Sequence, residues 1–166
     1  MPDPVAKTPF LDRLAQGLRR SLASRDPVWA ARHASAIERF AVAAGGFRGR
    51  QGKADLYYTA FAWRGLALLG RLQASARDAA REFLRLQRPA TIVDVFSALH
   101  LRQVLGDATG DAAPLLATVE ALRAPDGGYR KRPGGTPSVY HSFLAVLCHD
   151  LAGSVRPDSS GLARFL

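Results

Sequence analysis

The sequence has 166 residues, of which 48% are hydrophobic and 22% are charged, and its formal net charge is +9. These proportions exclude a disordered chain and indicate one globular domain with room for a hydrophobic core. The single cysteine excludes an internal disulfide, the first residues lack the apolar core of a signal peptide, and no apolar run reaches the roughly 18 residues that span a bilayer. We therefore expect a cytoplasmic protein with no membrane span.

Hydrophobic periodicity predicts seven helices, over about residues 9–24, 28–44, 56–73, 75–87, 91–106, 112–122 and 137–152. The helices at 56–73, 91–106 and 137–152 are apolar nearly all round, so we expect them in the interior. The helix at 75–87 carries charge on one side, as an outer helix does, and the charged first helix is expected to cap one end of the fold. Residues 1–153 are expected to form one domain, followed by a loop-like tail over 154–166.

The pattern from Gly45 to Gly70 returns from Gly127 to Gly153, 82 residues later at the glycines, and a weaker copy spans residues 91–106. Such a repeat predicts one supersecondary unit used several times, with inner and outer helices alternating. In this alignment Tyr58, Asp94 and His141 fall at one equivalent position of the three inner helices. We expect these side chains to converge on a shared surface.

The positive charge favours anionic partners: nucleic acid, acidic membrane surfaces or phosphorylated small molecules. Two short basic clusters each follow a double glycine and precede an inner helix; they are Arg48, Arg50 and Lys53, and Arg130, Lys131 and Arg132. Because no long Lys/Arg block occurs and the clusters repeat at equivalent places, small-anion sites are favoured and nucleic acid is an unlikely partner.

The motifs GGFRGR-x-x-K-x-D-x-Y-Y-T and GGY-x-x-R-P-G with VYHS resemble the repeats of protein prenyltransferase β subunits. That family shares an α/α toroid with the squalene and hopene cyclases. The resemblance implies an all-α fold, an α/α repeat array of about seven helices that makes a partial toroid. It also implies an isoprenoid diphosphate as ligand.

The resemblance assigns the diphosphate to Arg50 and Lys53, because Arg supplies paired donors and Lys a compact cation. The neighbouring Arg48, Arg130 and Arg132 are further candidates; a solvated basic turn is the alternative. Aromatic side chains on the inner helices are candidates for an isoprenoid pocket, or are ordinary core; they are Tyr57, Tyr58, Phe61, Trp63, Phe96 and Phe143.

The family's catalytic zinc is bound by an Asp, by a Cys two residues later, and by a His. Here Asp55 and His141 match the Asp and the His, but Tyr57 stands in place of the Cys. Zinc normally takes three protein ligands and keeps an open position, so we expect no zinc and no other cofactor. Asp55 as a helix cap and His141 as a core residue are the structural alternatives. Asp94 and His141 are the candidate catalytic acid/base pair, or else two separately satisfied groups.

No D-x-D-D cluster, P-loop, dinucleotide fingerprint or nucleophile elbow occurs. The favoured hypothesis is a prenyltransferase-like protein that binds an isoprenoid diphosphate or related lipid, with catalysis left open. The alternatives are an active prenyltransferase or terpene-cyclase subunit that needs a partner, and a helical module for protein or nucleic-acid interaction. Because the last inner helix has only a short polar tail to cover its apolar face, we expect a homodimer or a partner subunit to complete the toroid.

Overall fold

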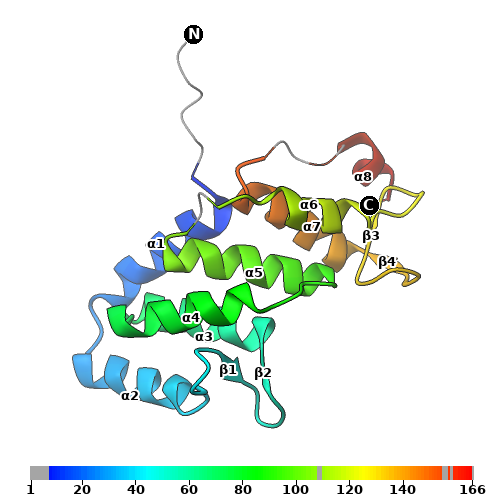
Figure 1. The fold of residues 1–166 in the computed structure, drawn as a ribbon. Helices are drawn as coiled ribbons and strands as arrows, with labels where there is room; N and C mark the ends of the chain where they lie inside the picture. The colour runs from blue at the N-terminus through cyan, green and yellow to red at the C-terminus, as the bar shows by residue number, and fades with distance from the viewer. Residues whose placement is uncertain (1–7, 108–109, 155–156, 158, 166) are drawn as a thin grey trace.

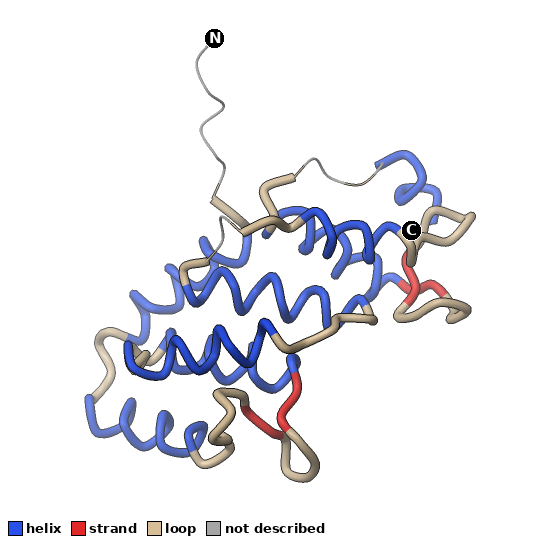
Figure 2. Tube along the Cα trace, viewed as in Figure 1, coloured by secondary structure: helices blue, strands red, loops and turns tan. Residues whose placement is uncertain are grey.

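The structure is a computed structural model that describes residues 8–107, 110–154, 157 and 159–165 (Figures 1 and 2). Its helices are α1 (Phe10–Leu22), α2 (Pro27–Glu38), α3 (Leu56–Leu68), α4 (Ala74–Arg85), α5 (Ile92–Leu105), α6 (Ala113–Glu120), α7 (Val139–Leu151) and α8 (Ser159–Phe165). The strands are β1 (Phe47–Arg48), β2 (Ala54–Asp55), β3 (Tyr129–Arg130) and β4 (Pro137–Ser138). The expected all-α fold with about seven helices is confirmed.

Three inner helices form a row in which α5 lies between α3 and α7. Outer helices cover this row: α2 packs on α3, α4 on α5, and α6 on both α5 and α7. The inner helices are apolar on several sides, so each buries side chains against both of its neighbours. Trp63 of α3 packs with Leu101 of α5, whereas Ile92 of α5 packs with Leu144 of α7.

The inner helices begin in the same way, which confirms the sequence alignment of the three repeats. Their N-caps are Asp55, Thr91 and Ser138, and each side chain accepts a hydrogen bond from the N–H three residues later, at 2.8, 3.2 and 3.2 Å. The donors are Tyr58, Asp94 and His141, the third residue of each helix. All three helices start at the side of the molecule that carries the two hairpins (Figure 2).

Each double glycine opens a short antiparallel hairpin, β1–β2 or β3–β4, which the sequence analysis did not predict. Gly45 and Gly127 have positive φ angles of 84° and 92°, and a Cβ there would lie 2.1 Å from the Ala79 carbonyl oxygen and 2.2 Å from that of Gly161. Helices α4 and α8 therefore press against the two hairpins in equivalent ways. The expected loop after Gly153 is wrong for residues 159–165, which form α8.

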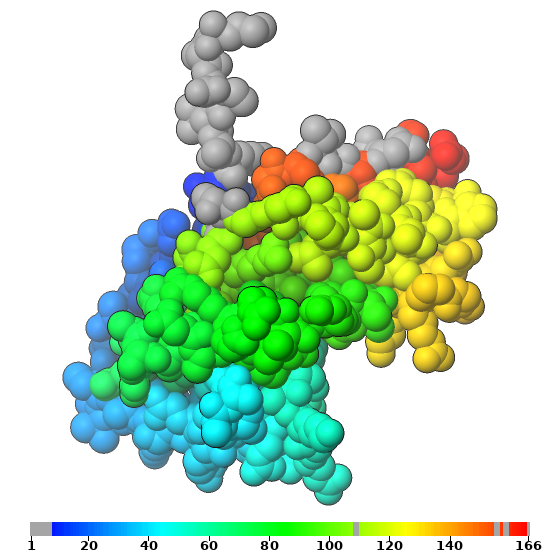
Figure 3. Space-filling view, in the orientation of Figure 1, coloured from blue at the N-terminus to red at the C-terminus, as the bar shows by residue number. Residues whose placement is uncertain are grey.

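The first helix does not cap an end of the row as expected. Instead α1 contacts both α3 and α7. In Figure 1 it passes behind α5, whereas α4 and α6 lie on the near face, which Figure 3 shows in space-filling form. The N–H of Phe10 donates to Asp150 Oδ2 at 2.6 Å, and Leu11 is buried in the core of α5 and α7. Because its partners lie in the C-terminal halves of the inner helices, α1 leaves their N-terminal halves open.

A polar network joins α6 to α7 and to the second hairpin. The Glu120 carboxylate accepts hydrogen bonds from the Tyr129 hydroxyl and from Arg123, both at 2.9 Å, and lies 3.1 Å from His149 Nε2. These side chains therefore hold α6, α7 and the second hairpin together. The longest described helix, α5, has 14 residues, and no described helix has the length and hydropathy required to cross a membrane.

Candidate functional site

The two hairpins present uncompensated positive charge at the N-terminal edge of the inner row. Arg48, Arg50 and Lys53 are exposed on the first hairpin, and Arg132 is exposed on the second, where Arg130 is half-buried. Among the described residues, none of these side chains takes part in an ion pair. Positive charge at this edge favours anions, and anion binding there stays a prediction.

Buried hydrogen bonds hold the hairpins onto the helices. The Phe47 N–H donates to Thr59 Oγ1 and the Tyr129 N–H donates to Ser142 Oγ, each at 2.9 Å. The Ile92 N–H donates to the Lys131 carbonyl at 3.1 Å, which ties the second hairpin to the start of α5. The basic side chains thus project from anchored backbone.

Large apolar side chains beside these hairpins remain open to solvent. Six of them, in the first halves of α3 and α7, are between 40% and 61% exposed; they are Tyr57, Tyr58, Phe61, Val139, Tyr140 and Phe143. Phe96 of α5 is half-buried. Trp63 differs from the sequence expectation, because it is only 3% exposed and belongs to the core between α3 and α5. It is not part of this surface.

One apolar groove, of about 370 Å³, brings a basic residue and the aromatic residues together. It lies between α2, β1 and α3, and Arg48, Tyr58 and Phe61 line it. The backbone of the hairpin passes so close to the Tyr58 ring that a Cβ at Gly49 would lie 2.6 Å from it. Glycine at this position is therefore what lets the first hairpin close over the end of the groove.

The groove also has a wall that the sequence analysis did not assign to the site. His33 and Ile37 of α2, and Phe40 just beyond its end, line it together with Phe61 of α3. Their spacing of four and three residues is the helical signal that places side chains on one face, so the pattern to find them was present. The spacing did not show which helix these side chains would face.

Asp94 and His141 are each bonded within their own helix. The Asp94 carboxylate accepts from the Thr91 N–H at 3.0 Å and from its hydroxyl at 2.8 Å, which completes a capping box. His141 Nδ1 lies 2.7 Å from Ser138 Oγ, and partial burial together with the Lys131 ammonium lowers the pKa of His141. No hydrogen bond joins Asp94 to His141 in the described part of the chain, and their acid/base role stays a prediction.

The residues matched to zinc ligands have structural partners. Asp55 is the N-cap of α3, and the Tyr57 ring meets the Tyr58 ring edge to face and the Phe61 ring at a tilt on the surface. Cys148 is fully buried, and burial raises its pKa to about 12, so its thiol stays protonated. Within the described ranges, no three His, Cys, Asp or Glu side chains gather as a metal site would require.

No protein-family model matches the sequence, and comparisons with curated proteins and with solved structures found no match. The resemblance to prenyltransferase repeats therefore depends on the glycine and basic motifs alone.

Proposed function

We propose that the protein binds an amphiphilic anion of the isoprenoid diphosphate class. Its prenyl chain occupies the groove between α2 and α3, and its diphosphate contacts the β1–β2 hairpin. The observation that carries the proposal is that Arg48 lines the same groove of about 370 Å³ as Tyr58 and Phe61. That volume lies within the range of sites for small organic ligands.

The residue types suit the two parts of such a ligand. The Arg48 and Arg50 guanidinium groups can each donate two parallel hydrogen bonds to a phosphate, and Lys53 adds a third cation without an ion-pair partner in the described structure. Tyr58, Phe61 and Phe40 offer apolar ring surface to the hydrocarbon. The proposal concerns binding, because Tyr57 replaces the thiolate through which the resembling enzymes hold their zinc.

A second copy of the chain is the proposed partner, and the internal repeat supports this choice. In the repeat alignment Val139, Phe143 and Val146 of α7 correspond to Leu56, Ala60 and Trp63 of α3. The α3 set is buried on the side toward α5, whereas Val139 and Phe143 are exposed. Helix α7 thus presents the side with which an inner helix contacts the next one.

The other end of the row presents the complementary side. Phe61 corresponds to Ser97 of α5 and Leu144 of α7. Both of these are buried, Leu144 in the core that α7 shares with α5, while Phe61 is exposed. In a head-to-tail pair, α7 of one copy packs against α3 of the other and continues the established contact between inner helices. Two copies close such a contact into a ring when the rotation between them is twofold.

This pairing also encloses the proposed ligand. The α7 of one copy covers the groove of the other, which excludes water from the prenyl chain. Because all inner helices begin at the same edge, the β3–β4 hairpin arrives beside the β1–β2 hairpin of the partner copy. Arg130 and Arg132 then join Arg50 and Lys53 around the diphosphate, which gives both basic hairpins one role.

Calorimetry with a prenyl diphosphate and its matching prenyl alcohol tests the binding proposal. Arg50→Ala with Lys53→Ala is expected to weaken diphosphate binding at least about tenfold and to leave the alcohol unchanged, since charge-assisted hydrogen bonds are lost. Phe61→Ser should weaken both ligands. Arg20→Ala with Arg25→Ala, which removes the same charge from exposed positions around the end of α1, is the matched control.

Equal losses for alcohol and diphosphate would contradict the assignment of the head group to the first hairpin. Absence of diphosphate binding to the unmodified protein would refute the proposal as a whole. Tight binding of arbitrary duplex DNA at physiological salt would favour a nucleic-acid function instead.

A further inference from the structure

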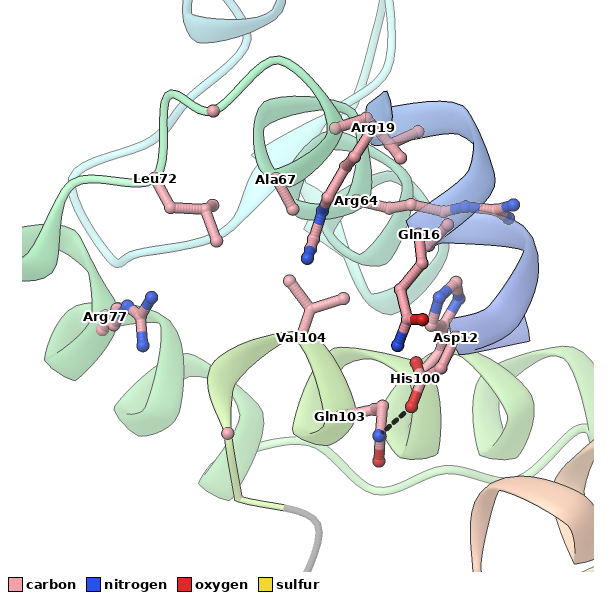
Figure 4. Close-up of a pocket in the computed structure, with 14 residues that line it drawn as sticks. Asp12, Gln16, Arg19, Arg64, Ala67, Leu72, Arg77, His100, Gln103 and Val104 are labelled. Atoms are coloured by element: carbon pink, nitrogen blue, oxygen red, sulfur yellow. Dashed lines mark hydrogen bonds between the residues drawn. The ribbon is translucent and has the colours of Figure 1, made fainter. Parts of the chain in front are cut away.

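A second and larger cavity, of about 610 Å³, lies at the C-terminal ends of the inner helices α3 and α5, away from the hairpins at their N-terminal ends. It forms where α1 crosses the C-terminal halves of α3 and α5, and the start of α4 closes one side (Figure 4). Its apolar floor includes Ala67, Leu72 and Val104. Residues from four helices therefore converge on a space that the proposed prenyl site does not use.

Three arginines and one carboxylate line this cavity. Arg19 comes from α1, Arg64 from α3 and Arg77 from α4, and none of them forms an ion pair with any described residue. Figure 4 shows Arg19 reaching toward the middle of the cavity and Arg77 on the opposite side, while Arg64 extends toward α1. The carboxylate of Asp12 accepts a hydrogen bond from Gln103. The lining has an excess of positive charge.

The buried His100 provides an independent sign of a polar ligand. It lines the cavity, is only 7% exposed, and makes no hydrogen bond to a described residue. Burial, helped by the nearby Arg64 guanidinium, lowers its pKa to about 4, so the imidazole is neutral at physiological pH. A neutral imidazole carries one N–H donor and one acceptor nitrogen, and without a described protein partner both are available to a group that enters the cavity.

The neutral donors complete the set of groups that an oxyanion requires. The Gln16 amide lies next to His100 in Figure 4, and both reach the cavity from the side opposite Arg77. The C-terminal ends of α3 and α5 also border the cavity, at Gly70 and Gly106, and carry partial negative charge. The guanidinium groups, not the helix ends, therefore attract the anion.

We propose that this cavity binds a small phosphate-bearing molecule with two or more negative charges. Arg19 and Arg77 contact the phosphate oxygens from opposite sides of the cavity. His100 and Gln16 also donate hydrogen bonds to these oxygens. Arg64 adds positive potential. A cavity of about 610 Å³ between four helices has the size of a site for a small molecule, not for a polynucleotide. This site lies apart from the hairpins and does not depend on the proposed prenyl site.

Titration with inorganic pyrophosphate, followed by NMR of the histidine rings, tests this proposal and separates the two sites. The chain has four histidines, of which His100 reports the cavity and His141, beside Lys131, reports the hairpin edge. Pyrophosphate is expected to shift the His100 resonances in the unmodified protein. His100→Gln identifies the signal.

Arg19→Gln with Arg77→Gln is expected to weaken the His100 response at least about tenfold, because two charge-assisted contacts are removed. Arg20→Gln with Arg25→Gln is the charge-matched control and should leave the response unchanged. Arg50→Ala with Lys53→Ala, which removes the proposed prenyl head-group contacts, should also leave it unchanged. Circular dichroism spectra and melting curves of the variants verify that each one folds.

Three results would overturn the proposal. The first is that millimolar pyrophosphate leaves His100 unaffected in the unmodified protein. The second is that the control pair, Arg20 and Arg25, costs as much affinity as the cavity pair. The third is that only His141 responds, which would locate all anion binding at the hairpins.

Discussion

The unprotonated His100 makes folding sensitive to acid. In the unfolded chain its pKa is about 6.5, and in the folded protein burial and Arg64 lower that pKa to about 4. Between these two pH values the unfolded state binds the proton more readily than the folded state does. Lowering the pH from 6.5 to 4 is therefore expected to cost roughly 3 kcal/mol of the free energy of unfolding through this group.

Urea unfolding at pH 7 and at pH 4.5 measures this effect. His100→Gln, which has no titrating ring, should lose less stability between the two pH values than the unmodified protein does. The comparison isolates His100, because the carboxylates titrate alike in both proteins. An identical loss in the two proteins would mean that His100 is already solvated.

Two buried serines on inner helices should respond to alanine in opposite directions. Ser97 and Ser142 are each 1% exposed, but Ser142 Oγ accepts the Tyr129 N–H whereas Ser97 Oγ has no hydrogen-bond partner among the described residues. Ser97→Ala removes an unsatisfied polar atom and is expected to raise the free energy of unfolding by about 1 kcal/mol. Ser142→Ala leaves a buried N–H unpaired and should lower it by about 1 to 3 kcal/mol.

Chemical denaturation of the two serine variants in parallel provides the measurement. A destabilising Ser97→Ala would show that its hydroxyl has a partner, such as a bound water.

At the scale of elements, the hairpins depend on glycines for two separable reasons. Gly45 and Gly52 both have positive φ, at 84° and 89°, but a Cβ at Gly45 would overlap the Ala79 carbonyl of α4, whereas nothing lies within 4 Å of one at Gly52. Gly52→Ala is expected to cost about 1 to 2 kcal/mol from backbone strain alone. Gly45→Ala should cost more than about 3 kcal/mol, because α4 has to move as well.

The second hairpin supplies the same comparison, with Gly127 against α8 and Gly134 in open space, at φ angles of 92° and 71°. Thermal unfolding of all four alanine variants is the measurement. Equal costs within each pair would contradict the tight packing of α4 and α8 on the hairpins.

Elements were predictable where one physical cause dominates. The inner helices are apolar on nearly every side, and only a central position satisfies that pattern. Helix ends were less predictable: the helix expected to reach residue 44 ends at Glu38, because Ala41 pairs with Phe47 and the Val42 N–H bonds to the Gly46 carbonyl. The strands have two residues each, too few for an alternating pattern to be visible.

The missed helix α8 did have a sequence signal. Gly161 and Phe165 meet the second hairpin as Ala79 and Phe83 meet the first, at the same offset of 82 residues as the glycines. The position of α1 had no such signal, since an amphipathic helix shows that one side is buried but not what covers it. The cavity between α1 and α4 could not be predicted from the sequence either, because it depends on where α1 lies.

For the whole molecule, the open ends of the inner row predict head-to-tail pairing of two copies. Phe143→Asp places a charge on the exposed side of α7 and is expected to convert dimers to monomers, as light scattering across a concentration series would detect. Leu86→Asp, at an exposed leucine of the outer layer, is the matched control and should leave the dimer intact.

Mixing two variants distinguishes this α7-to-α3 contact from one in which α7 packs on α7 or α3 packs on α3. Phe143→Asp places a charge on the contact surface of α7, and Phe61→Asp places one on the contact surface of α3. Each variant alone is therefore expected to be monomeric. Their mixture retains one intact junction and should form heterodimers. A Phe61→Asp protein that dimerises as well as the unmodified one would exclude the head-to-tail contact, and an unmodified protein that is monomeric at high concentration would exclude pairing altogether.

The crossing of α1 over the inner row has a kinetic consequence. Contacts along the row join helices that are near in sequence, whereas the Phe10 N–H meets Asp150 across 140 residues of chain. Closing so long a loop is slow and entropically costly, so α1 is expected to dock last during folding and to detach first. Amide hydrogens of α1 should then exchange faster than those of α5. A phosphate compound that bridges Arg19 on α1 to Arg77 on α4 would hold α1 in place. It should slow amide exchange in α1 and leave the exchange rates in α5 unchanged.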